Sequence, residues 1–450
     1  MISITKKIKI PENPFLLFLP FLLVYIIITV VFQNNDLWGD ENRHLLYAQN
    51  LTHGFYSNPP PDIYLDCGPG YPVILIPFVL LSLPVICVKL LNAFFLFLSV
   101  IFLFKALLHF ISFKKAAFVS LFFACYYNIF YFLPLIYSEI FTLFLISALL
   151  LSLVLAFGSS GLIKSKRYVY LSGFLMGFIA LTKVIFGYVI LFMLLGSAVL
   201  WILNRKNSQF RKGVLILLIS SATVLPYLIY TYQLTGRVFY WATTGGNNLY
   251  WMSSPYEGEY GSWAPDIAAG SASLYKLDSI AFFNRGNLVS KEGSFFVPGY
   301  EDSIVAHHMG DYNDINKYMG LKRDDEFRRI AFRNIRSNPT KFIRNCFSNI
   351  GRILFNTPGS YVVQKPGNMT RLPLNGIIVV LSLFCIIPTL RNWRRLPYTI
   401  RFVLIFTFLY LAGSVFGSAE ARMFSIIVPL LLCWIAFILQ KSVKINIKFR

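Results

Sequence analysis

Two adjacent carboxylates, Asp40 and Glu41, stand at the start of a helix-like pattern directly after the first apolar run. A carboxylate that faces a cavity at the membrane can accept a proton from an attacking hydroxyl group. The nearby Arg43 and His44 could tune such a carboxylate or bind phosphate. The alternative is structural, because Asp is a good N-cap and acids favour the first turn of a helix. Spacing alone favours the cap.

Three more ionisable residues interrupt apolar sequence. Glu139 lies about one turn inside an apolar run, where such a group normally faces a bundle interior or a cavity, unless it snorkels to the interface. Lys183 occupies the outer turn of a helix pair and could hold a phosphate as a point charge, although an interfacial lysine would look the same. Arg422 begins the last apolar run, and its guanidinium suits a phosphate ester or a diphosphate.

Other chemistry finds less support. His307 and His308, with Asp311 and Asp314, could form a metal cluster, but their spacing matches no strong zinc site, and we interpret them as the polarity of an exposed loop. We therefore assign no metal ligand, and keep a divalent metal open as a cofactor. The six cysteines show neither metal spacing nor a disulfide framework. No phosphate-binding loop or dinucleotide fingerprint is present, so nucleotide chemistry is unsupported.

Composition identifies the elements that must position these residues. The chain has 450 residues, of which 56% are hydrophobic and 14% charged, whereas soluble domains have about 25% charged residues. Apolar runs of roughly 17–22 residues are long enough to cross a hydrocarbon core of about 30 Å as helices. We predict an all-α polytopic membrane protein, with a short re-entrant or interfacial helix at 72–84. The predicted spans, about ten in number, are 14–32, 86–108, 116–133, 136–156, 168–182, 184–203, 213–232, 373–390, 399–418 and 421–440.

The charge distribution sets the topology. The net charge of +21 comes largely from Lys and Arg in short loops between apolar runs, which argues against nucleic-acid binding. With both termini in the cytoplasm, the cytoplasmic segments contain only one of the 20 acidic residues, Glu12. Runs 168–182 and 184–203 stay separate, because merging them would move the basic cluster Arg205–Lys212 outside. The first run, Pro14–Phe32, exceeds a signal-peptide core of about 7–15 residues, and we interpret it as a retained anchor.

Three regions follow from this topology. Residues 1–232 form an N-terminal transmembrane module with a first outer loop at 33–85, residues 233–372 form an extracytoplasmic domain, and residues 373–450 form C-terminal transmembrane helices. The middle region mixes turn-rich sequence with a helical stretch, Asp324–Phe355, that must break at Asn338-Pro339. This stretch is basic and amphipathic, which suits either an anionic headgroup surface or a solvated helical face. Its basic residues are Arg328, Arg329, Arg333, Arg336, Lys341, Arg344 and Arg352.

An ordered set of short motifs resembles a known family. The sequence is similar to the GT-C-fold glycosyltransferases of the protein mannosyltransferase and aminoarabinose transferase superfamily, especially their bacterial dolichyl-phosphate-mannose-protein mannosyltransferase-like branch. Lys183 stands where many relatives have Arg, and Ala421-Arg422-Met423 replaces the commoner Pro-Arg-Tyr. The matching segments are WGDE-x(5)-Y at Trp38–Tyr47, GPGYP at Gly68–Pro72, YSE at Tyr137–Glu139, Thr235–Trp251, Phe327–Arg344 and Ala419–Pro429.

The resemblance implies a polyprenyl-phosphate-linked sugar as donor and transfer on the outer face of a bacterial inner membrane, in glycan biosynthesis of the cell envelope. Asp40 would be the general base in an inverting reaction, with Glu41 beside it. The acceptor would be a lipid or glycan, or else a protein. Residues that would stabilise the leaving phosphate are Lys183, Arg237 and Arg422. Residues that would bind sugar or acceptor are Glu139, Arg43, Tyr47, Tyr71 and Trp251, although core packing explains the three aromatic residues equally well.

Three other function classes compete with this hypothesis, and one of them, a structural membrane subunit, would not need Glu139 in a span. A lipid-linked oligosaccharide ligase or polymerase would use a diphosphate donor and depend on outer arginines rather than on Asp40 and Glu41. A lipid-sugar flippase or transporter would show paired half-repeats and charges near the midplane. The sequence shows no internal duplication, and its acidic residues gather at the outer ends of the spans.

Overall fold

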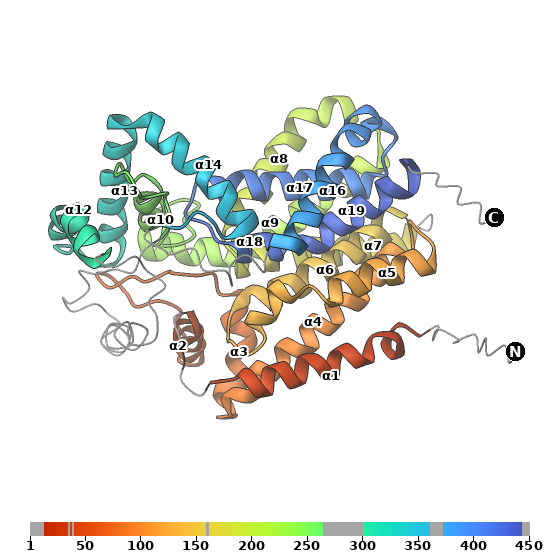
Figure 1. Ribbon diagram of the computed structural model, residues 1–450, viewed down its shortest axis with the longest axis horizontal. Helices are drawn as coiled ribbons and strands as arrows, with labels where there is room; N and C mark the ends of the chain where they lie inside the picture. Colours follow the sequence, from red (N-terminus) through yellow and green to blue (C-terminus); the bar gives the residue numbers. More distant parts are fainter. Residues whose placement is uncertain are drawn as a thin grey trace, which may run out of the picture.

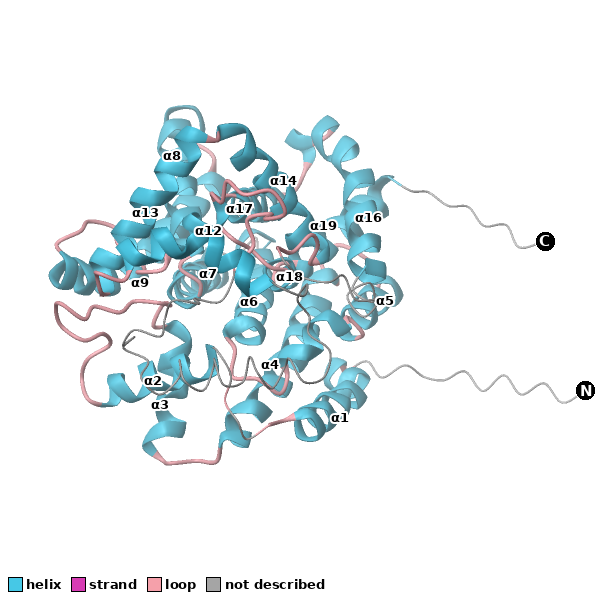
Figure 2. Cartoon of the chain, turned by 60° about the vertical axis from the view of Figure 1, so that its left-hand side comes forward, coloured by secondary structure: helices cyan, strands magenta, loops and turns pink. Residues whose placement is uncertain are grey.

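The computed structural model describes residues 13–34, 37, 40–158, 162–263, 300–360 and 372–442. In these ranges the chain forms helices, turns and loops without a strand (Figures 1 and 2). Trp38 and Gly39 of the first motif, and the basic residues Lys6, Lys7 and Lys9 near the start of the chain, lie outside the described residues.

Among the described residues, seven helices are long and apolar enough to cross a membrane. They correspond to seven of the predicted spans, and they confirm an all-α polytopic membrane protein. They are α1 (Pro14–Phe32), α4 (Val85–Leu107), α6 (Ser138–Gly158), α8 (Ile185–Asn204), α9 (Ser208–Thr235), α16 (Leu372–Arg391) and α17 (Tyr398–Val415).

Of the other three predicted spans, two are divided and one lies in a single helix that also carries basic residues. Segment 116–133 divides at Cys125 into α5 (Phe113–Ala124) and the 3-10 turn η1 (Tyr127–Phe132). Segment 421–440 divides into α18 (Ala421–Ser425) and α19 (Val428–Ser442), with Pro429 in the first turn of α19, where proline is tolerated but cannot continue a preceding helix. Segment 168–182 lies in α7 (Leu162–Thr182), and the first two turns of this helix contain basic residues. The chain turns at Lys183, so α7 and α8 are separate, as predicted.

Helix α6 occupies the centre of the bundle. It is apolar on every side, and a helix of that kind must be buried all round. It packs against α4, α7, α9, α17 and α19, while α1 packs on α4 at the edge. Helix α1 begins and α19 ends at one end of the bundle (Figure 1).

The segment between α9 and α16 builds a smaller core at the opposite end of the bundle (Figure 1). Its helices are α10 (Gly245–Met252), α12 (Tyr300–Ile315), α13 (Gly320–Ser337) and α14 (Pro339–Phe355). The break between α13 and α14 falls at Asn338-Pro339, as predicted. Several basic residues of this stretch are paired within the segment instead of forming one free basic face, because Arg333 contacts Asp311 and buried Arg352 donates to the carbonyls of Tyr260 and Pro358.

Two short helices from the first outer loop complete the fold. Helix α2 (Asp40–Thr52) packs against α3 (Gly70–Leu80), which covers most of the predicted interfacial helix at 72–84. Helix α3 also contacts α7. The start of α2 therefore lies beside the end of α7 and the turn at Lys183.

Candidate active site

Asp40 begins α2 and forms two ion pairs. Its Oδ1 lies 3.1 Å from Arg43 NH1, one turn along the same helix. Its Oδ2 accepts from Arg422 NH1 at 3.0 Å, across 382 positions of sequence. The side chain remains 26% exposed, so the carboxylate is held by cations and still open to a ligand.

Glu139 belongs to the same cluster and lies in the first turn of α6. It is 1% exposed, and its Oε1 accepts from Lys183 Nζ at 2.8 Å. The same oxygen lies 3.4 Å from Arg422 NH1. Arg422 therefore bridges Asp40 and Glu139, and the buried Glu139 avoids snorkelling by pairing with two cations. We name Asp40, Arg43, Glu139, Lys183 and Arg422 the ion-pair cluster.

The glycines of the GPGYP motif bring the first loop against the turn that carries Lys183. A Cβ on Gly68 would lie 1.9 Å from the carbonyl oxygen of Leu181, and a Cβ on Gly70 would lie 2.5 Å from Thr182 Oγ1. Only residues without a side chain permit this approach. The motif therefore has a packing role beside the cluster.

We expect Gly68→Ala to lower stability and activity together. The added methyl group meets backbone, which cannot swing aside, and overpacking of this kind costs about 1–3 kcal/mol. Thermal unfolding in detergent measures the loss, with Gly196→Ala as control, because a Cβ at Gly196 meets nothing within 4 Å. Equal melting temperatures of Gly68→Ala and wild type would contradict the tight contact.

The charges around Asp40 keep it ionised. Burial by itself would raise the pKa of Asp40, but the positive charges of Arg43 and Arg422 outweigh it and hold the pKa below its ordinary value. In His44, burial lowers the pKa to about 4, so this side chain is neutral at neutral pH. His44 therefore supplies no positive charge for a phosphate, although the sequence left that role open.

The pKa of His44 predicts acid sensitivity. Below the ordinary value of 6.5 the unfolded chain takes up a proton that folded His44 refuses until about pH 4, so stability falls as the pH drops through this window. We expect His44→Gln to flatten the decline of melting temperature between these values. Exposed His53→Gln should leave the decline unchanged, and a wild-type slope in His44→Gln would show that His44 does not contribute.

Glu41 faces away from the ion-pair cluster. It is fully buried, its Oε1 accepts from the backbone N–H of Ile136 at 2.8 Å, and the same atom lies 3.6 Å from Lys89 Nζ. Lys89 is also fully buried and donates to the carbonyl of Asn34 at 2.6 Å. These contacts tie α2 to α4 and to the start of α6. They give Glu41 a structural role, and its catalytic role stays a prediction.

Four other predicted site residues lie away from the cluster or have no free face. Tyr47 and Tyr71 are 2% and 1% exposed, with Tyr47 stacked on Tyr56 and Tyr71 packed edge-on against His44. Trp251 is 2% exposed in the smaller core. The burial of these rings favours core packing over contact with a sugar, and the sugar contact stays a prediction. Arg237 forms a two-pronged ion pair with Asp325 and makes no contact with the cluster among the described residues.

Three residues that pair with predicted site residues were missed in the sequence. Asp66 Oδ2 lies 3.4 Å from Arg43 Nε, and Glu420 Oε2 lies 3.1 Å from Arg422 Nε. Both are acids beside motifs that had been noticed, GPGYP and AEARMF. Lys89 is the third, and its signal was a lone charge near the start of an apolar run.

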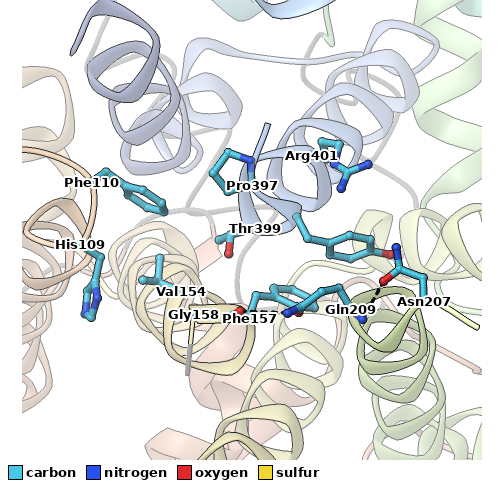
Figure 3. Close-up of a pocket in the computed structure, with 11 residues that line it drawn as sticks. His109, Phe110, Val154, Phe157, Gly158, Asn207, Gln209, Pro397, Thr399 and Arg401 are labelled. Carbon is cyan, nitrogen blue, oxygen red and sulfur yellow. Dashed lines mark hydrogen bonds between the residues drawn. The ribbon is translucent and has the colours of Figure 1, made fainter. Parts of the chain in front are cut away.

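A separate hollow lies at the other end of the bundle (Figure 3). Its walls come from the ends of α4 and α6 and the starts of α9 and α17, where Phe157, Tyr398 and Arg401 face it. It shares no residue with the ion-pair cluster. Its lining residues include no Asp or Glu, so the hollow lacks the carboxylate that the expected chemistry needs.

Comparisons with known proteins agree with the fold. Neither a protein-family model nor a curated protein matches the chain. The oligosaccharyltransferase of Archaeoglobus fulgidus, tethered with an acceptor peptide, matches with a TM-score of 0.50 at 12% identity over 94% of this chain and 49% of that chain. Its apo form matches with a TM-score of 0.50 at 14% identity over 93% and 50% of the two chains. ArnT from Cupriavidus metallidurans, bound to undecaprenyl phosphate, gives a TM-score of 0.41 at 12% identity over 94% and 78%.

The chain spans about half the length of the archaeal oligosaccharyltransferase, and at this identity the likeness concerns the fold. Together with the seven membrane-crossing helices among the described residues, it confirms the expected architecture. The chain is an all-α polytopic membrane protein with the GT-C fold of membrane glycosyltransferases.

Proposed function

We propose that this protein is an inverting membrane glycosyltransferase. It moves a sugar from a polyprenyl phosphate to an acceptor hydroxyl group on the outer face of a bacterial inner membrane, with both termini in the cytoplasm and residues 233–372 outside. One observation carries the proposal: a partly exposed carboxylate, Asp40, shares an ion-pair cluster with two cations, Lys183 and Arg422, that converge on one buried Glu139. A base and a phosphate-binding pair are the two parts that such a transfer needs.

The reaction balances with these groups. Asp40 accepts the proton of the acceptor hydroxyl, whose oxygen attacks the anomeric carbon. The bond from that carbon to the phosphate oxygen breaks, and polyprenyl phosphate leaves with an added negative charge. Lys183 and Arg422 lie where they can stabilise that charge, and preorganised cations in a poorly solvated site are effective at this. Glu139 orients both cations.

The ion pair between Asp40 and Arg422 couples donor binding to catalysis. A carboxylate paired with a guanidinium is a weak base, because its pKa is low. A donor phosphate competes for Arg422 and weakens its hold on Asp40, which raises the pKa of Asp40 when the substrate arrives. The base is therefore strongest in the complex that uses it.

Donor preference tests the proposal directly. Purified protein is supplied with a labelled sugar on either polyprenyl monophosphate or polyprenyl diphosphate, and the anomeric configuration of the product is read by NMR. We expect transfer from the monophosphate with inversion. Transfer only from the diphosphate would instead identify an oligosaccharide ligase or polymerase, the second candidate, and movement of lipid across vesicles without any transfer would identify a flippase.

Reporter fusions test on which side of the membrane each segment lies. A reporter after Arg450 should report the cytoplasm, and one inserted near residue 270 should report the outside. The same side at both positions would overturn the proposed topology.

A further inference from the structure

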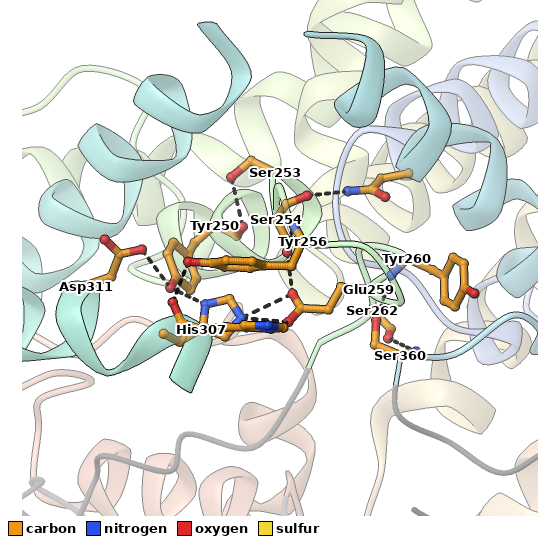
Figure 4. A network of polar contacts seen from close by, with 12 residues as sticks. Tyr250, Ser253, Ser254, Tyr256, Glu259, Tyr260, Ser262, His307, Asp311 and Ser360 are labelled. Carbon is orange, nitrogen blue, oxygen red and sulfur yellow. Dashed lines mark hydrogen bonds and ion pairs between the residues drawn. The ribbon is translucent and has the colours of Figure 1, made fainter. Parts of the chain in front are cut away.

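Two histidines and a glutamate converge in the smaller core, outside the ion-pair cluster. His307 projects from α12 toward Glu259, which lies in the loop after α10 (Figure 4). The next residue, His308, contacts the same carboxylate. Glu259 Oε1 lies 3.0 Å from His307 Nδ1 and 3.1 Å from His308 Nε2, while Oε2 lies 3.1 Å from His308 Nε2. Glu259 and His308 are almost fully buried, and the His307 side chain is 31% exposed. The loop polarity expected at these positions is therefore wrong: this is a helix with a buried imidazole.

Neighbouring contacts fix which nitrogen of His308 carries the proton. The Asp311 carboxylate pairs with Arg333 at 2.6 Å through Oδ1, and the Tyr250 hydroxyl donates to its Oδ2 at 3.1 Å. The Tyr250 oxygen is then left to accept, and it does so from His308 Nδ1 at 2.6 Å. A neutral His308 with its proton on Nδ1 presents a lone pair at Nε2.

That lone pair points at a carboxylate. Two acceptors at this separation repel one another in a buried site unless a positive charge lies between them. Protonation of His308 would supply one charge, and a neutral His307 can then donate from Nδ1 to the same Glu259 oxygen. A divalent ion is the other source of positive charge, because the three residues each offer one ligand atom to a common point, and one ion binds both neutral imidazoles and the carboxylate together.

The ligand types select the metal. Two imidazole nitrogens and one carboxylate oxygen suit Zn²⁺ and similar late first-row ions, whereas Mg²⁺ and Ca²⁺ prefer oxygen ligands alone. Tetrahedral bonds of about 2.0–2.1 Å separate ligand atoms by about 3.3 Å, and Glu259 Oε1 lies 3.0 and 3.1 Å from the two histidine nitrogens. All three ligand atoms lie within 4.8 Å of one another. Outer contacts that orient the ligands are also present, since Ser254 Oγ donates to Glu259 Oε2 and Tyr250 holds His308.

We propose that Glu259, His307 and His308 bind one zinc-class divalent ion. The ion fastens the loop after α10 to α12. Two hydrogen bonds also link this loop to α14: Lys341 Nζ donates to the carbonyl of Glu259 at 2.7 Å, and Arg352 donates to the carbonyl of Tyr260. The site stabilises the segment between α9 and α16, and it needs no role in sugar transfer.

Metal content and thermal stability test the site in the full-length protein. Detergent-purified protein is stripped with a chelator, titrated with Zn²⁺ or Mg²⁺, and followed by elemental analysis and thermal unfolding. We expect about one bound zinc and a rise in melting temperature that Mg²⁺ does not reproduce. Glu259→Gln and His308→Ala should lose most of the bound zinc and the temperature rise, while exposed His109→Ala serves as the matched control and should keep both.

Two further variants keep the test decisive if the alanine variant folds poorly. Tyr250→Phe leaves all three ligands but removes the hydroxyl that fixes His308, and it should weaken zinc binding about 10–100-fold. His307→Cys keeps a ligand, and its cobalt(II) complex should gain a thiolate-to-cobalt absorption band in the near ultraviolet. Any one of three results would overturn the proposal: equal zinc content in wild type and His308→Ala, no rise in the melting temperature of wild type with zinc, or no new band in folded His307→Cys. The cluster would then be a protonated histidine paired with a carboxylate.

Discussion

Asp40→Asn is expected to lower the turnover number for sugar transfer by about 10²–10⁴-fold, the usual contribution of a positioned general base. The amide keeps the size of the carboxylate but cannot accept the acceptor proton. Donor binding should weaken little or even improve, because the amide no longer competes with the donor phosphate for Arg422, which lies 3.0 Å from Asp40 Oδ2. The measurement is initial rate against donor concentration, with labelled polyprenyl-phosphate sugar and purified protein.

A matched variant separates catalysis from folding. Asp66→Asn alters a carboxylate that also contacts Arg43, at 3.4 Å, but lies one contact further from Arg422. We expect it to retain much more activity than Asp40→Asn at similar melting temperature. Equal transfer rates for Asp40→Asn and wild type would remove Asp40 as the base, and a loss in Asp66→Asn as large as in Asp40→Asn would assign the effect to the position of Arg43.

The pH profile gives a second readout of the same residue. The low pKa of Asp40 means that the free enzyme keeps this carboxylate ionised throughout the mildly acidic range. The kcat/KM for the donor, which reports the free enzyme, should therefore not fall through protonation of Asp40 between neutral pH and about pH 5. A fall that survives in Asp40→Asn would belong to another group.

The sequence was sufficient for the bundle because its signals are local. Apolar runs of membrane-crossing length and basic loops can each be recognised within about 20 residues. The failures occurred where a short segment depends on its neighbours: α5 ends at Cys125, and α18 and α19 are separate although both are apolar. Residues next to these breaks anchor them to other helices: Tyr126 is buried and donates to Asn375 Oδ1, and Ile427 is fully buried.

The ion-pair cluster was predicted in part. Asp40, Glu139, Lys183 and Arg422 stood out as charges at the ends of apolar runs, and the fold brings these four together. Glu41 could not be distinguished from Asp40 by sequence, since adjacent residues on a helix point about 100° apart and only packing decides which is buried. The clustering of Glu259 with His307 and His308 depends on a contact across 48 positions, which spacing within the chain cannot reveal.

Arg422 offers the second large effect. Its guanidinium contacts Asp40, Glu139 and Glu420 at 3.0, 3.4 and 3.1 Å. Its removal takes one cation from each of these carboxylates and, in the proposed mechanism, the forked donor from the phosphate. We expect Arg422→Gln to lower kcat/KM for the donor by about 10²–10³-fold, the typical cost of losing one charge-stabilising group. Initial rates over a range of donor concentrations measure this change.

Two variants show whether the charge or the forked shape matters. Arg422→Lys restores a positive charge but not the paired donors, so it should recover part of the activity and mainly lower the apparent affinity for the donor. Glu420→Gln removes an exposed partner of Arg422 and should change the rate only a few-fold, because exposed ion pairs contribute about 0–1 kcal/mol. If Arg422→Gln and Glu420→Gln lost activity equally, Arg422 would act by holding α18 in place, and the phosphate would have to be bound by Lys183 alone.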